Sequence, residues 1–551
     1  MKNGRLTLTL LWIFSALFVL SGCLDENPKD QIWEDKTQET LQSLYLNYVA
    51  SLYTHIGGYK DSEGLQGTTR GIYDFNTLTT DEAMIPVRGG DWFDGGFWQE
   101  LYFHTWGVNN KALKAVWEYL YKVVILSNHS IEVLEKNKEK FDERKMEEYI
   151  AEIRAFRAIY YYYLLDLFAR VPITTSSTIP IHEIKQRERS EVFSFVVDEL
   201  TSVIPSLSSD YSHRLGSYYG RVTQPVAYFV LAKLFLNAEV YMHNDWTEEG
   251  RPDGSTFRFN INGKPHNAWE ATLYYCNKIS ELGYRLSDHY EDNFEIFNES
   301  SVENIFIIPM DKRSYTNQMQ YLFRSLHYNH AQALGMAGEN GTSATITVLN
   351  VAGYDTEDVD PRFDKNYYAG VMYDLEGNVI QTDFGQVLEY RPWEVKLDLS
   401  DSPYQKVAGA RMKKYAIDKT NIKDGKLIDN DIVLFRYADV LLMQAEAKVR
   451  NGENGDSELN EVRARVGAAH RKATLENILD ERLLELAWEG WRRQDLIRFD
   501  QYHKSYDDRP QLSNEENRYT TVFPIPKSIL DLNDNLMQNR GYEIDKGLNI
   551  E

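Results

Sequence analysis

The chain has 551 residues, of which 43% are hydrophobic, so it is long enough to bury one very large core or two ordinary ones. Its formal net charge of −23 disfavours binding to nucleic acid or to anionic membrane surfaces, because like charges repel. This charge does not affect neutral ligands such as sugars. The aromatic content of 13% is high, so we expect aromatic residues to take part in core packing or in ligand contact.

The N-terminus has the organisation of a secretory signal. A basic start and a short apolar run, residues 6–20, precede the tetrapeptide Leu-Ser-Gly-Cys that ends at Cys23. This tetrapeptide is similar to a bacterial lipobox, in which the cysteine is acylated and becomes the first residue. We therefore predict a signal peptide over residues 1–22, lipidation of Cys23, and a flexible tether over residues 23–36. No later run is long and apolar enough to cross a bilayer.

Helical periodicity dominates two parts of the chain, about 40–282 and 431–500. Residues 147–172 are apolar or small on nearly every face, which predicts a helix buried between neighbours and ended by Pro172. Further helices are expected at 40–52, 109–134, 190–207, 223–241, 266–282, 435–449, 456–466 and 474–499, with Ser190 and Thr223 as N-caps. Alanine-rich helices approach closely, so we expect stacked helical hairpins.

Two other segments, about 55–107 and 284–430, lose this periodicity. The first is rich in Gly, Asp and Trp, and the second breaks into short apolar runs between polar loops. A long irregular span within a compact domain is usually functional, so we expect both segments to form a ligand face. The C-terminal residues 505–551 are expected to be mostly extended, because Pro524 and Pro526 restrict the backbone.

The loop from residue 88 to residue 98 is the main candidate for ligand contact. Its two Gly-Gly pairs are incompatible with a stable helix interior and would let aromatic rings project. Sugar rings lie on aromatic planes through their C–H faces, and their hydroxyls pair with charged groups. The candidate contacts in this loop are Arg88, Asp91, Trp92, Phe93, Asp94 and Trp98. Trp393 and Tyr321 are weaker candidates from the second segment. The alternative is that these rings fill the core beneath a long loop.

Other groupings are interpreted as structural. Six charged residues recur every three or four positions, which is typical of helix ion pairs rather than of acid–base catalysis: Arg482, Glu485, Glu489, Arg492, Asp495 and Arg498. The acidic residues of 355–360 lack the spacing of a calcium loop, so an exposed acidic turn is expected there. Tyr160 to Tyr163 are assigned to the core, and Cys276 is predicted to be a buried, inert thiol.

Sequence motifs of catalysis are missing from the chain. It contains no HExxH, Gly-x-Ser-x-Gly, phosphate-binding glycine loop or His/Cys metal spacing. A glycosidase needs two carboxylates about 5–10 Å apart, and nothing in the sequence selects such a pair. We therefore predict a protein that is not an enzyme and that uses no cofactor, metal or catalytic residue.

Several stretches together resemble the SusD/RagB family of outer-membrane nutrient-binding lipoproteins. They are the lipobox at Cys23 and residues 79–96, 153–173, 220–241, 434–447, 478–499 and 523–542. The resemblance implies a mainly α, single globular body over residues 37–551, with about four TPR-like helix pairs. It also implies a SusC-type TonB-dependent transporter as partner. The acids after Cys23 resemble a surface-export signal, so the resemblance implies an outer-membrane anchor and a body that faces the extracellular side.

The function expected from these observations is capture of oligosaccharide at the cell surface for delivery to the transporter. Three alternatives remain open. The same scaffold could capture a peptide or another nutrient, since a fold does not choose its ligand. A surface glycan hydrolase would release products from an oligosaccharide. A purely structural helical-repeat adaptor would be unaffected by loss of Trp92 and Trp98.

Overall fold

The computed structural model describes residues 40–66, 68–314, 320–422 and 425–542, without the side chains of Gln320, Tyr321 and Asn514. The chain divides into two compact units, residues 1–45 and 46–551. The described part of the first unit is the short helix α2 (Leu41–Leu44), whose N-cap Thr40 accepts the backbone N–H of Ser43 at 3.0 Å. The predicted signal peptide, Cys23 and tether lie outside the described residues.

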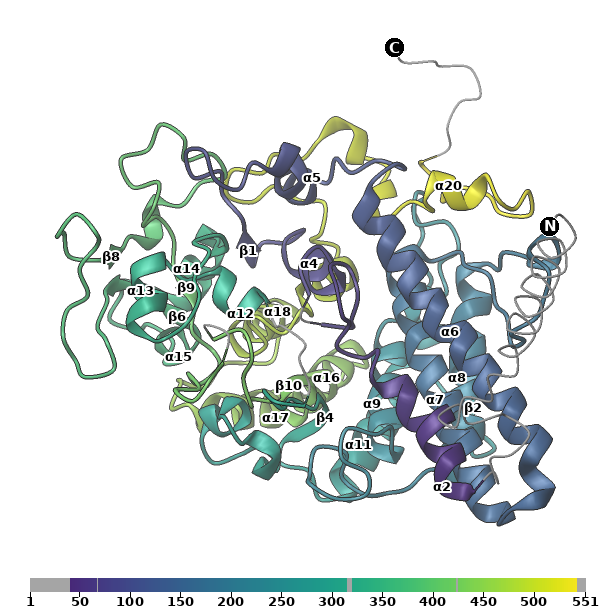
Figure 1. The fold of residues 1–551 in the computed structure, drawn as a ribbon. Helices are drawn as coiled ribbons and strands as arrows, with labels where there is room; N and C mark the ends of the chain where they lie inside the picture. The colour runs from purple at the N-terminus through teal and green to yellow at the C-terminus, as the bar shows by residue number, and fades with distance from the viewer. Residues whose placement is uncertain (1–39, 67, 315–319, 423–424, 543–551) are drawn as a thin grey trace, which may run out of the picture. The chain divides into compact units, whose positions relative to one another are not determined.

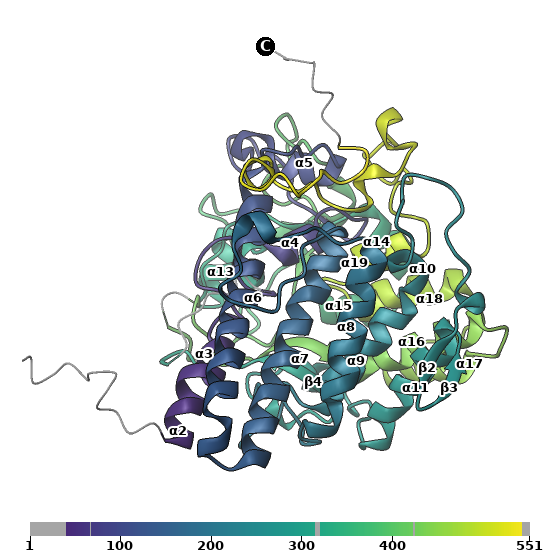
Figure 2. The same ribbon diagram turned by 90° about the vertical axis from the view of Figure 1, so that its right-hand side faces the viewer.

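The second unit is mainly helical, and its long helices lie side by side in chain order (Figures 1 and 2). They are α6 (Lys111–Asn137), α7 (Glu143–Phe168), α8 (Arg189–Val203), α9 (Gln224–Leu236), α11 (Ala268–Glu281), α16 (Tyr437–Arg450) and α17 (Asp456–Arg465). Each of these helices packs against the next. The mainly α fold of stacked helical hairpins is therefore confirmed.

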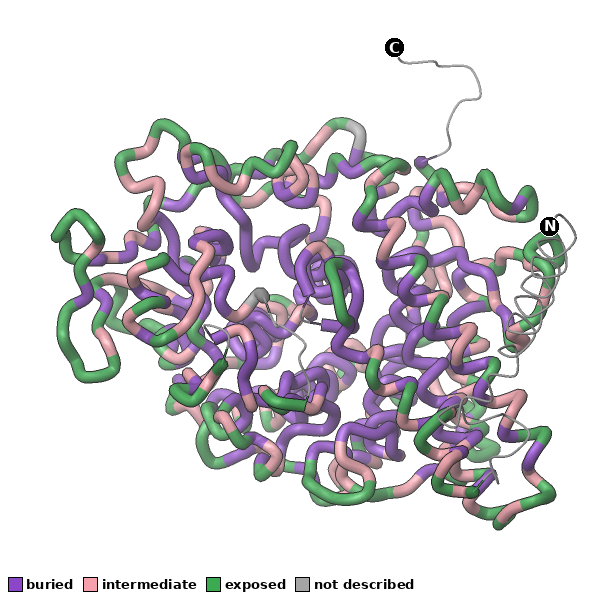
Figure 3. Tube along the Cα trace, viewed as in Figure 1, coloured by how far each residue is buried: buried purple, intermediate pink, exposed green. Residues whose placement is uncertain are grey.

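The helix α7 has a fully buried C-terminal half. Every residue from Ala155 to Phe168 is buried, because α6 covers one side of the helix and α8 another. Figure 3 shows the long helices mostly in the colour of buried residues, whereas exposed residues gather in the loops. The assignment of Tyr160 to Tyr163 to the core is confirmed. The helix ends four residues before Pro172, where Ala169 takes a positive φ of 55°.

Some boundaries differ from the expectation, as in the helix expected over 223–241, which is divided into α9 and α10 (Ala238–Tyr241). The N-cap of α8 is Glu188 rather than Ser190, because Glu191 reaches back and its carboxylate accepts the backbone N–H of Glu188 at 2.8 Å. The single helix expected over 474–499 is two helices, α18 (Leu475–Glu485) and α19 (Arg492–Arg498). The chain breaks between them at Trp488, whose φ is 65° and whose buried indole donates to the carbonyl of Asn366 at 3.0 Å.

The rest of the second unit, which includes the irregular segments, contains short helices and two-stranded sheets. The shorter helices are α3 (Ser51–Tyr53), α4 (Ile72–Thr77), α5 (Phe97–Phe103), α10 (Ala238–Tyr241), α12 (Gln320–Arg324), α13 (Tyr328–Ala333), α14 (Ile346–Ala352), α15 (Phe363–Asn366) and α20 (Lys527–Leu530). The strands are β1 (Ala83–Met84), β2 (Phe259–Ile261), β3 (Lys264–His266), β4 (Asn304–Ile308), β5 (Ser343–Ala344), β6 (Tyr367–Tyr368), β7 (Gly370–Val371), β8 (Glu389–Tyr390), β9 (Arg411–Met412) and β10 (Ile432–Arg436).

These sheets connect parts of the chain that are distant in sequence. β4 pairs antiparallel with β10, so the long insertion between α11 and α16 leaves and rejoins the helical row at one place. β1 pairs antiparallel with β5, and β5 contacts β9. Residues 83–98 are thereby fixed against the insertion. In both ribbon views α5 lies at the upper end of the unit (Figures 1 and 2).

The C-terminal segment returns to the start of the helical row. The backbone N–H of Phe523 donates to the carbonyl of Leu167 at 2.8 Å. The amide of Asn539 donates to the carbonyl of Phe168 at 2.7 Å. The indole of Trp106 donates to the hydroxyl of Tyr542 at 2.6 Å. The described tail is therefore part of the packed unit.

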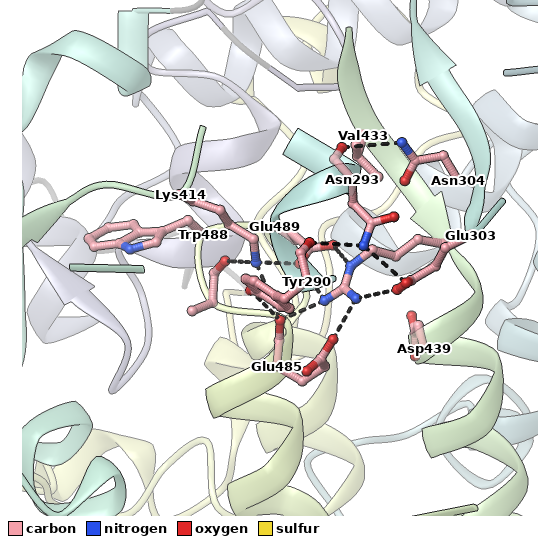
Figure 4. Close-up of polar contacts among 12 residues, drawn as sticks. Tyr290, Asn293, Glu303, Asn304, Lys414, Val433, Asp439, Glu485, Trp488 and Glu489 are labelled. Atoms are coloured by element: carbon pink, nitrogen blue, oxygen red, sulfur yellow. Dashed lines mark hydrogen bonds and ion pairs between the residues drawn. The ribbon is translucent and has the colours of Figure 1, made fainter. Parts of the chain in front are cut away.

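Glu485, which ends α18, and Glu489 belong to a buried network of ion pairs, which we call the ionic core. Its central members are Glu303, Arg362, Lys414, Arg436, Arg465, Glu485 and Glu489. Figure 4 shows Glu303, Glu485 and Glu489 converging on one guanidinium, with Lys414 beside Glu489. The structural interpretation is supported. Of the six charged residues predicted to pair along one helix, Asp495 and Arg498 do so in α19 at 2.8 Å, whereas the other partners lie on other elements.

No described helix combines the length and the hydrophobicity needed to span a lipid bilayer. Cys276 is a free cysteine buried in α11, and burial raises the pKa of its thiol. A thiol with a raised pKa carries little thiolate, the reactive form, at neutral pH. The prediction of a buried thiol is confirmed.

Candidate functional site

The loop of residues 88–98 begins with a tight turn. Arg88 and Asp91 face each other across Gly89 and Gly90, with the N–H of Arg88 donating to the carbonyl of Asp91 at 3.0 Å. Gly89 has φ 68°, a conformation that most other residues adopt only with strain. Just before the turn, Val87 exchanges backbone hydrogen bonds of 2.9 Å with Leu397 and Leu399. The base of the loop is thus attached to the insertion.

Arg88 is fully buried beneath this turn rather than exposed to ligand. Its guanidinium donates to the carbonyl of Gln405 at 2.8 Å, to the hydroxyl of Ser343 at 2.7 Å, and to the carbonyls of Ala408 at 3.1 Å and Gly341 at 3.3 Å. The expectation that Arg88 contacts the ligand is therefore corrected. Its donors are occupied by protein acceptors, and its role is to join the loop to two segments of the insertion, 341–343 and 405–408.

Trp98 is also buried, because it begins the packed face of α5. Its indole donates to Asp94 at 2.8 Å, and Asp94 also accepts from Arg70 at 2.7 Å. The guanidinium of Arg70 lies 5.2 Å from the centre of the Trp98 ring, within cation–π range. For Trp98 the alternative of a ring that fills the core is the one observed, so its expected ligand contact is corrected. Asp94 remains exposed and supports Trp98.

Trp92 is held in an uncommon backbone conformation. Its φ is 65°, which costs a non-glycine residue about 1–3 kcal/mol and persists only where the surroundings impose it. The indole donates to the carbonyl of Glu339 at 2.9 Å. The ring lies against Gly341, where an added Cβ would approach it to 2.7 Å. Trp92 is half-buried, and its position depends on a glycine of the insertion.

Asp91 and two residues of the insertion form a polar group beside Trp92. Lys406 donates to the carboxylate of Asp91 at 2.6 Å, and the hydroxyl of Tyr328 lies 3.4 Å from the same oxygen. The hydrogen bond from Lys406 lowers the pKa of Asp91. Both side chains of the ion pair are open to solvent, and the ring of Tyr328 is 45% exposed. This group offers a carboxylate, an ammonium and a phenol to a polar ligand.

Phe93 projects from the loop and is 59% exposed. It lines an open hollow of about 890 Å³ together with Gly89, Gly90, Gln99 and Asp398. The hollow combines an aromatic face, a glycine floor and amide and carboxylate groups. These are the features expected of a surface that takes a sugar ring.

The remaining predicted contacts lie elsewhere or are not described. Trp393 is exposed, and its indole donates to Asp355 at 2.7 Å. The side chain of Tyr321 lies outside the described residues. Within the acidic segment 355–360, Asp360 is buried and paired with Arg362 at 2.8 Å. Among the described residues no group of three or more His, Cys, Asp or Glu is placed to hold a metal ion.

We call the exposed part of this site the loop patch: Asp91, Trp92, Phe93, Tyr328 and Lys406. Tyr328 and Lys406 were not identified from the sequence, because the hydrogen bonds that bring them to Asp91 join residues 237 and 315 positions apart. The only local signal was their location in the irregular segment. The arrangement can bind a ligand by ring stacking and hydrogen bonds.

Two protein-family models match the chain. One, described as "Starch-binding associating with outer membrane", matches residues 75–236, and the other, described as "SusD family", matches residues 302–542. The chain belongs to the SusD family. Both halves of the loop patch fall within these matches, Asp91, Trp92 and Phe93 in the first, and Tyr328 and Lys406 in the second.

Individual SusD relatives are similar along most of the chain. The starch-binding protein SusD of Bacteroides thetaiotaomicron is 23% identical over 521 residues, which are 87% of each chain. A laminarin-binding SusD-like protein of known structure superposes with a TM-score of 0.67 at 19% identity, covering 92% of this chain and all of that one. The surface glycan-binding protein A of Bacteroides thetaiotaomicron, solved with laminarihexaose, gives 0.66 at 20% identity, covering 91% and 100%. These structures establish the SusD fold.

Proposed function

We propose that this protein is a non-enzymatic, surface-exposed lipoprotein that captures oligosaccharide at the outer membrane and delivers it to a SusC-type TonB-dependent transporter. The observation that carries the capture step is the loop patch, in which Phe93 is exposed two residues along the loop from Asp91, which pairs with Lys406 and lies near the hydroxyl of Tyr328. A sugar offers C–H faces to the rings and hydroxyls to the charged groups.

The support beneath the patch favours binding without rearrangement. Buried Arg88 fixes the turn, and Trp92 is seated on Gly341. A surface that is already in its binding conformation loses less entropy when it takes up a flexible chain. The relatives named for starch and laminarin binding support a glucan as the first ligand class to examine.

Calorimetry of the purified protein with starch oligosaccharides and laminarihexaose tests the capture step. Phe93→Ala is expected to weaken binding about tenfold, because an aromatic contact contributes roughly 0.5–1.5 kcal/mol. Phe297→Ala is the matched control, since Phe297 is 66% exposed and does not line the hollow beside Phe93. Equal effects of the two variants would remove the loop patch from the proposal.

The same samples test the alternatives. Chromatography after incubation should recover the oligosaccharide intact, whereas released products would identify a hydrolase. If a wide glycan panel gives no heat and a peptide panel does, the ligand is a peptide.

The anchor and the transporter are tested separately. Cys23→Ala is expected to release the protein from the outer membrane, because each buried acyl methylene contributes about 0.8 kcal/mol to anchoring. Gentle detergent extraction of the wild-type protein is expected to co-purify a TonB-dependent transporter. Recovery of the lipoprotein alone would contradict the delivery step and leave the capture step standing.

A further inference from the structure

A second pocket lies among the helices, on residues that take no part in the loop patch. It has a volume of about 250 Å³ and is bounded by the first turn of α8, by residues 240–251 and by residues 497–521. Pockets for drug-sized ligands are larger, roughly 300–1,000 Å³. The space therefore suits a small molecule or a single substituent of a larger one.

Arg189, the first residue of α8, lines this pocket and is only 1% exposed. Its guanidinium lies 5.3 Å from the ring centre of Tyr241 and 5.7 Å from that of Trp246. Its Nε and Nη1 atoms are buried and have no hydrogen-bond acceptor among the described residues. Burial lowers the pKa of Arg189 to about 10, which leaves the group charged at neutral pH.

Most other buried arginines among the described residues form an ion pair with an acidic side chain. Arg498, for example, is held by the two oxygens of Glu446 at 2.7 and 2.8 Å. A buried charge without such a partner is strongly destabilising unless something else compensates it. Cation–π contacts with the two rings compensate only in part, because they supply no hydrogen-bond acceptor.

The acids around Arg189 form hydrogen bonds or ion pairs with other residues, and Glu188, its neighbour in sequence, pairs with Arg170 at 3.1 Å. Asp166 accepts the hydroxyl of Tyr241 at 2.8 Å and a nitrogen of Arg493 at 2.9 Å. Asp500, on the pocket wall, accepts from Arg251 at 2.8 Å.

Two further acids line the pocket. Glu515 is held by Arg509, and the carboxylate of Glu516 is on the exposed rim. The interior of the pocket is thus left with an unpaired cation and with the side chains of His243 and His503.

We propose that this pocket binds a small oxyanion, a carboxylate or a phosphate, which pairs with the guanidinium of Arg189. A planar guanidinium forms two parallel hydrogen bonds with such a group, and the rings of Tyr241 and Trp246 exclude water from the pair. The anion arrives either as the charged group of an acidic sugar or as a free ion. The proposal is independent of glycan capture at the loop patch.

Thermal unfolding and calorimetry with glucuronate and with inorganic phosphate test this site. A ligand that binds only the folded state raises the melting temperature. Millimolar glucuronate or phosphate is expected to raise it above the value in potassium chloride of equal ionic strength, and neutral glucose is not. A response to glucuronate alone assigns an acidic sugar, and a response to phosphate alone assigns the free ion.

Three variants locate the effect. Arg189→Met is expected to fold, to melt at or above the wild-type temperature without anion, and to lose the anion response, because an apolar chain replaces an unpaired charge. Arg189→Lys keeps the positive charge but cannot form two parallel hydrogen bonds, so its melting temperature should rise less on addition of the anion. Arg518→Met alters an arginine on the exposed pocket rim and should leave the response intact.

Several outcomes overturn the proposal. One is a wild-type response no greater than that to chloride or glucose. Another is an anion response that survives in Arg189→Met. If Arg189→Met does not fold, the comparison of wild type with Arg189→Lys decides, because equal responses in the two would show that the guanidinium fork is not used.

Discussion

The ionic core and the loop patch are both built from charged and aromatic residues, yet they differ in what surrounds them. In the ionic core, Glu485 accepts from Arg362 at 2.9 Å and from Arg436 at 2.6 Å, and all three side chains are buried. Burial alone would raise the pKa of Glu485, but Arg465, Arg436 and Arg362 lower it well below its usual range. In the loop patch, Asp91 and Lys406 pair at 2.6 Å in contact with solvent.

This difference in burial distinguishes charged residues that stabilise the fold from charged residues that are free to bind a ligand. A buried network has its donors and acceptors filled by protein groups, so it cannot offer them to a sugar, and removal of one member leaves the others uncompensated. An exposed pair contributes little to stability, because solvent already weakens it. The same exposure lets it exchange its partners for those of a ligand.

The largest effect is expected from Arg436→Met. This change leaves Glu303, Glu485 and Glu489 buried with fewer cations, which should destabilise the protein by about 3–5 kcal/mol. Urea unfolding measures the loss. Lys114→Met removes the exposed Lys114–Glu118 pair of α6 and should cost less than about 0.5 kcal/mol. If both variants lost a similar free energy of unfolding, the proposed difference between buried and exposed ion pairs would be wrong.

Arg88→Met is expected to come next. Four protein acceptors lose their donor, and buried unsatisfied groups cost about 1–3 kcal/mol each before relaxation, so we expect a net loss of about 2–3 kcal/mol. Glycan affinity should fall as well, because the turn that positions Trp92 and Phe93 is released. Unchanged stability with lost binding would instead assign Arg88 a direct contact with the ligand.

Gly341→Ala adds one methyl group at the position where the ring of Trp92 packs against Gly341, so it tests whether this packing matters for binding. An added Cβ would lie 2.7 Å from the ring, and overpacking of this kind costs about 1–3 kcal/mol. Since the loop can move, we expect stability to fall by only about 1 kcal/mol while glycan affinity falls more. Gly107→Ala is the control, because no atom lies within 4 Å of its added methyl. Full affinity in Gly341→Ala would exclude Trp92 from the site.

The smallest effect on stability is expected from Asp91→Asn at neutral pH. This change removes only the exposed ion pair with Lys406, which should cost less than about 1 kcal/mol of unfolding free energy. The hydrogen bond from Lys406 lowers the pKa of Asp91 below its ordinary value of 3.8, so the stabilising pair is fully present above that value. Its contribution disappears only as the pH falls through the lowered pKa. Glycan affinity should therefore stay level between about pH 5 and pH 8, where calorimetry can follow it. A marked loss across that window would contradict the assignment.

Much of the helical row could be predicted from the sequence, because the apolar period is a local property. The burial of Tyr160 to Tyr163 followed from a helix with no polar face. The break between α18 and α19 could not be predicted, since residues 486–490 continue a helix-compatible pattern. The break is fixed by distant partners: Asn366 accepts the indole of Trp488, and Glu82 accepts its backbone N–H.

The site was predicted only in part for the same reason. Glycine pairs and aromatic residues correctly marked the loop as irregular. They could not reveal that Arg88 points inward, because its acceptors lie 253 to 320 positions away. Tyr328 and Lys406 reach Asp91 only through the fold of the insertion. Local composition therefore finds the segment, and tertiary contacts decide which of its side chains face solvent.

The return of the C-terminal segment to α7 has a consequence for biosynthesis. The carbonyls of Leu167 and Phe168 receive their donors from Phe523 and Asn539, and Asn539 is synthesised 371 residues after Phe168. Until then the end of α7 lacks its cover, and a long chain must be closed before these contacts form. The end of α7 therefore reaches its final packing only after these distant residues have been made.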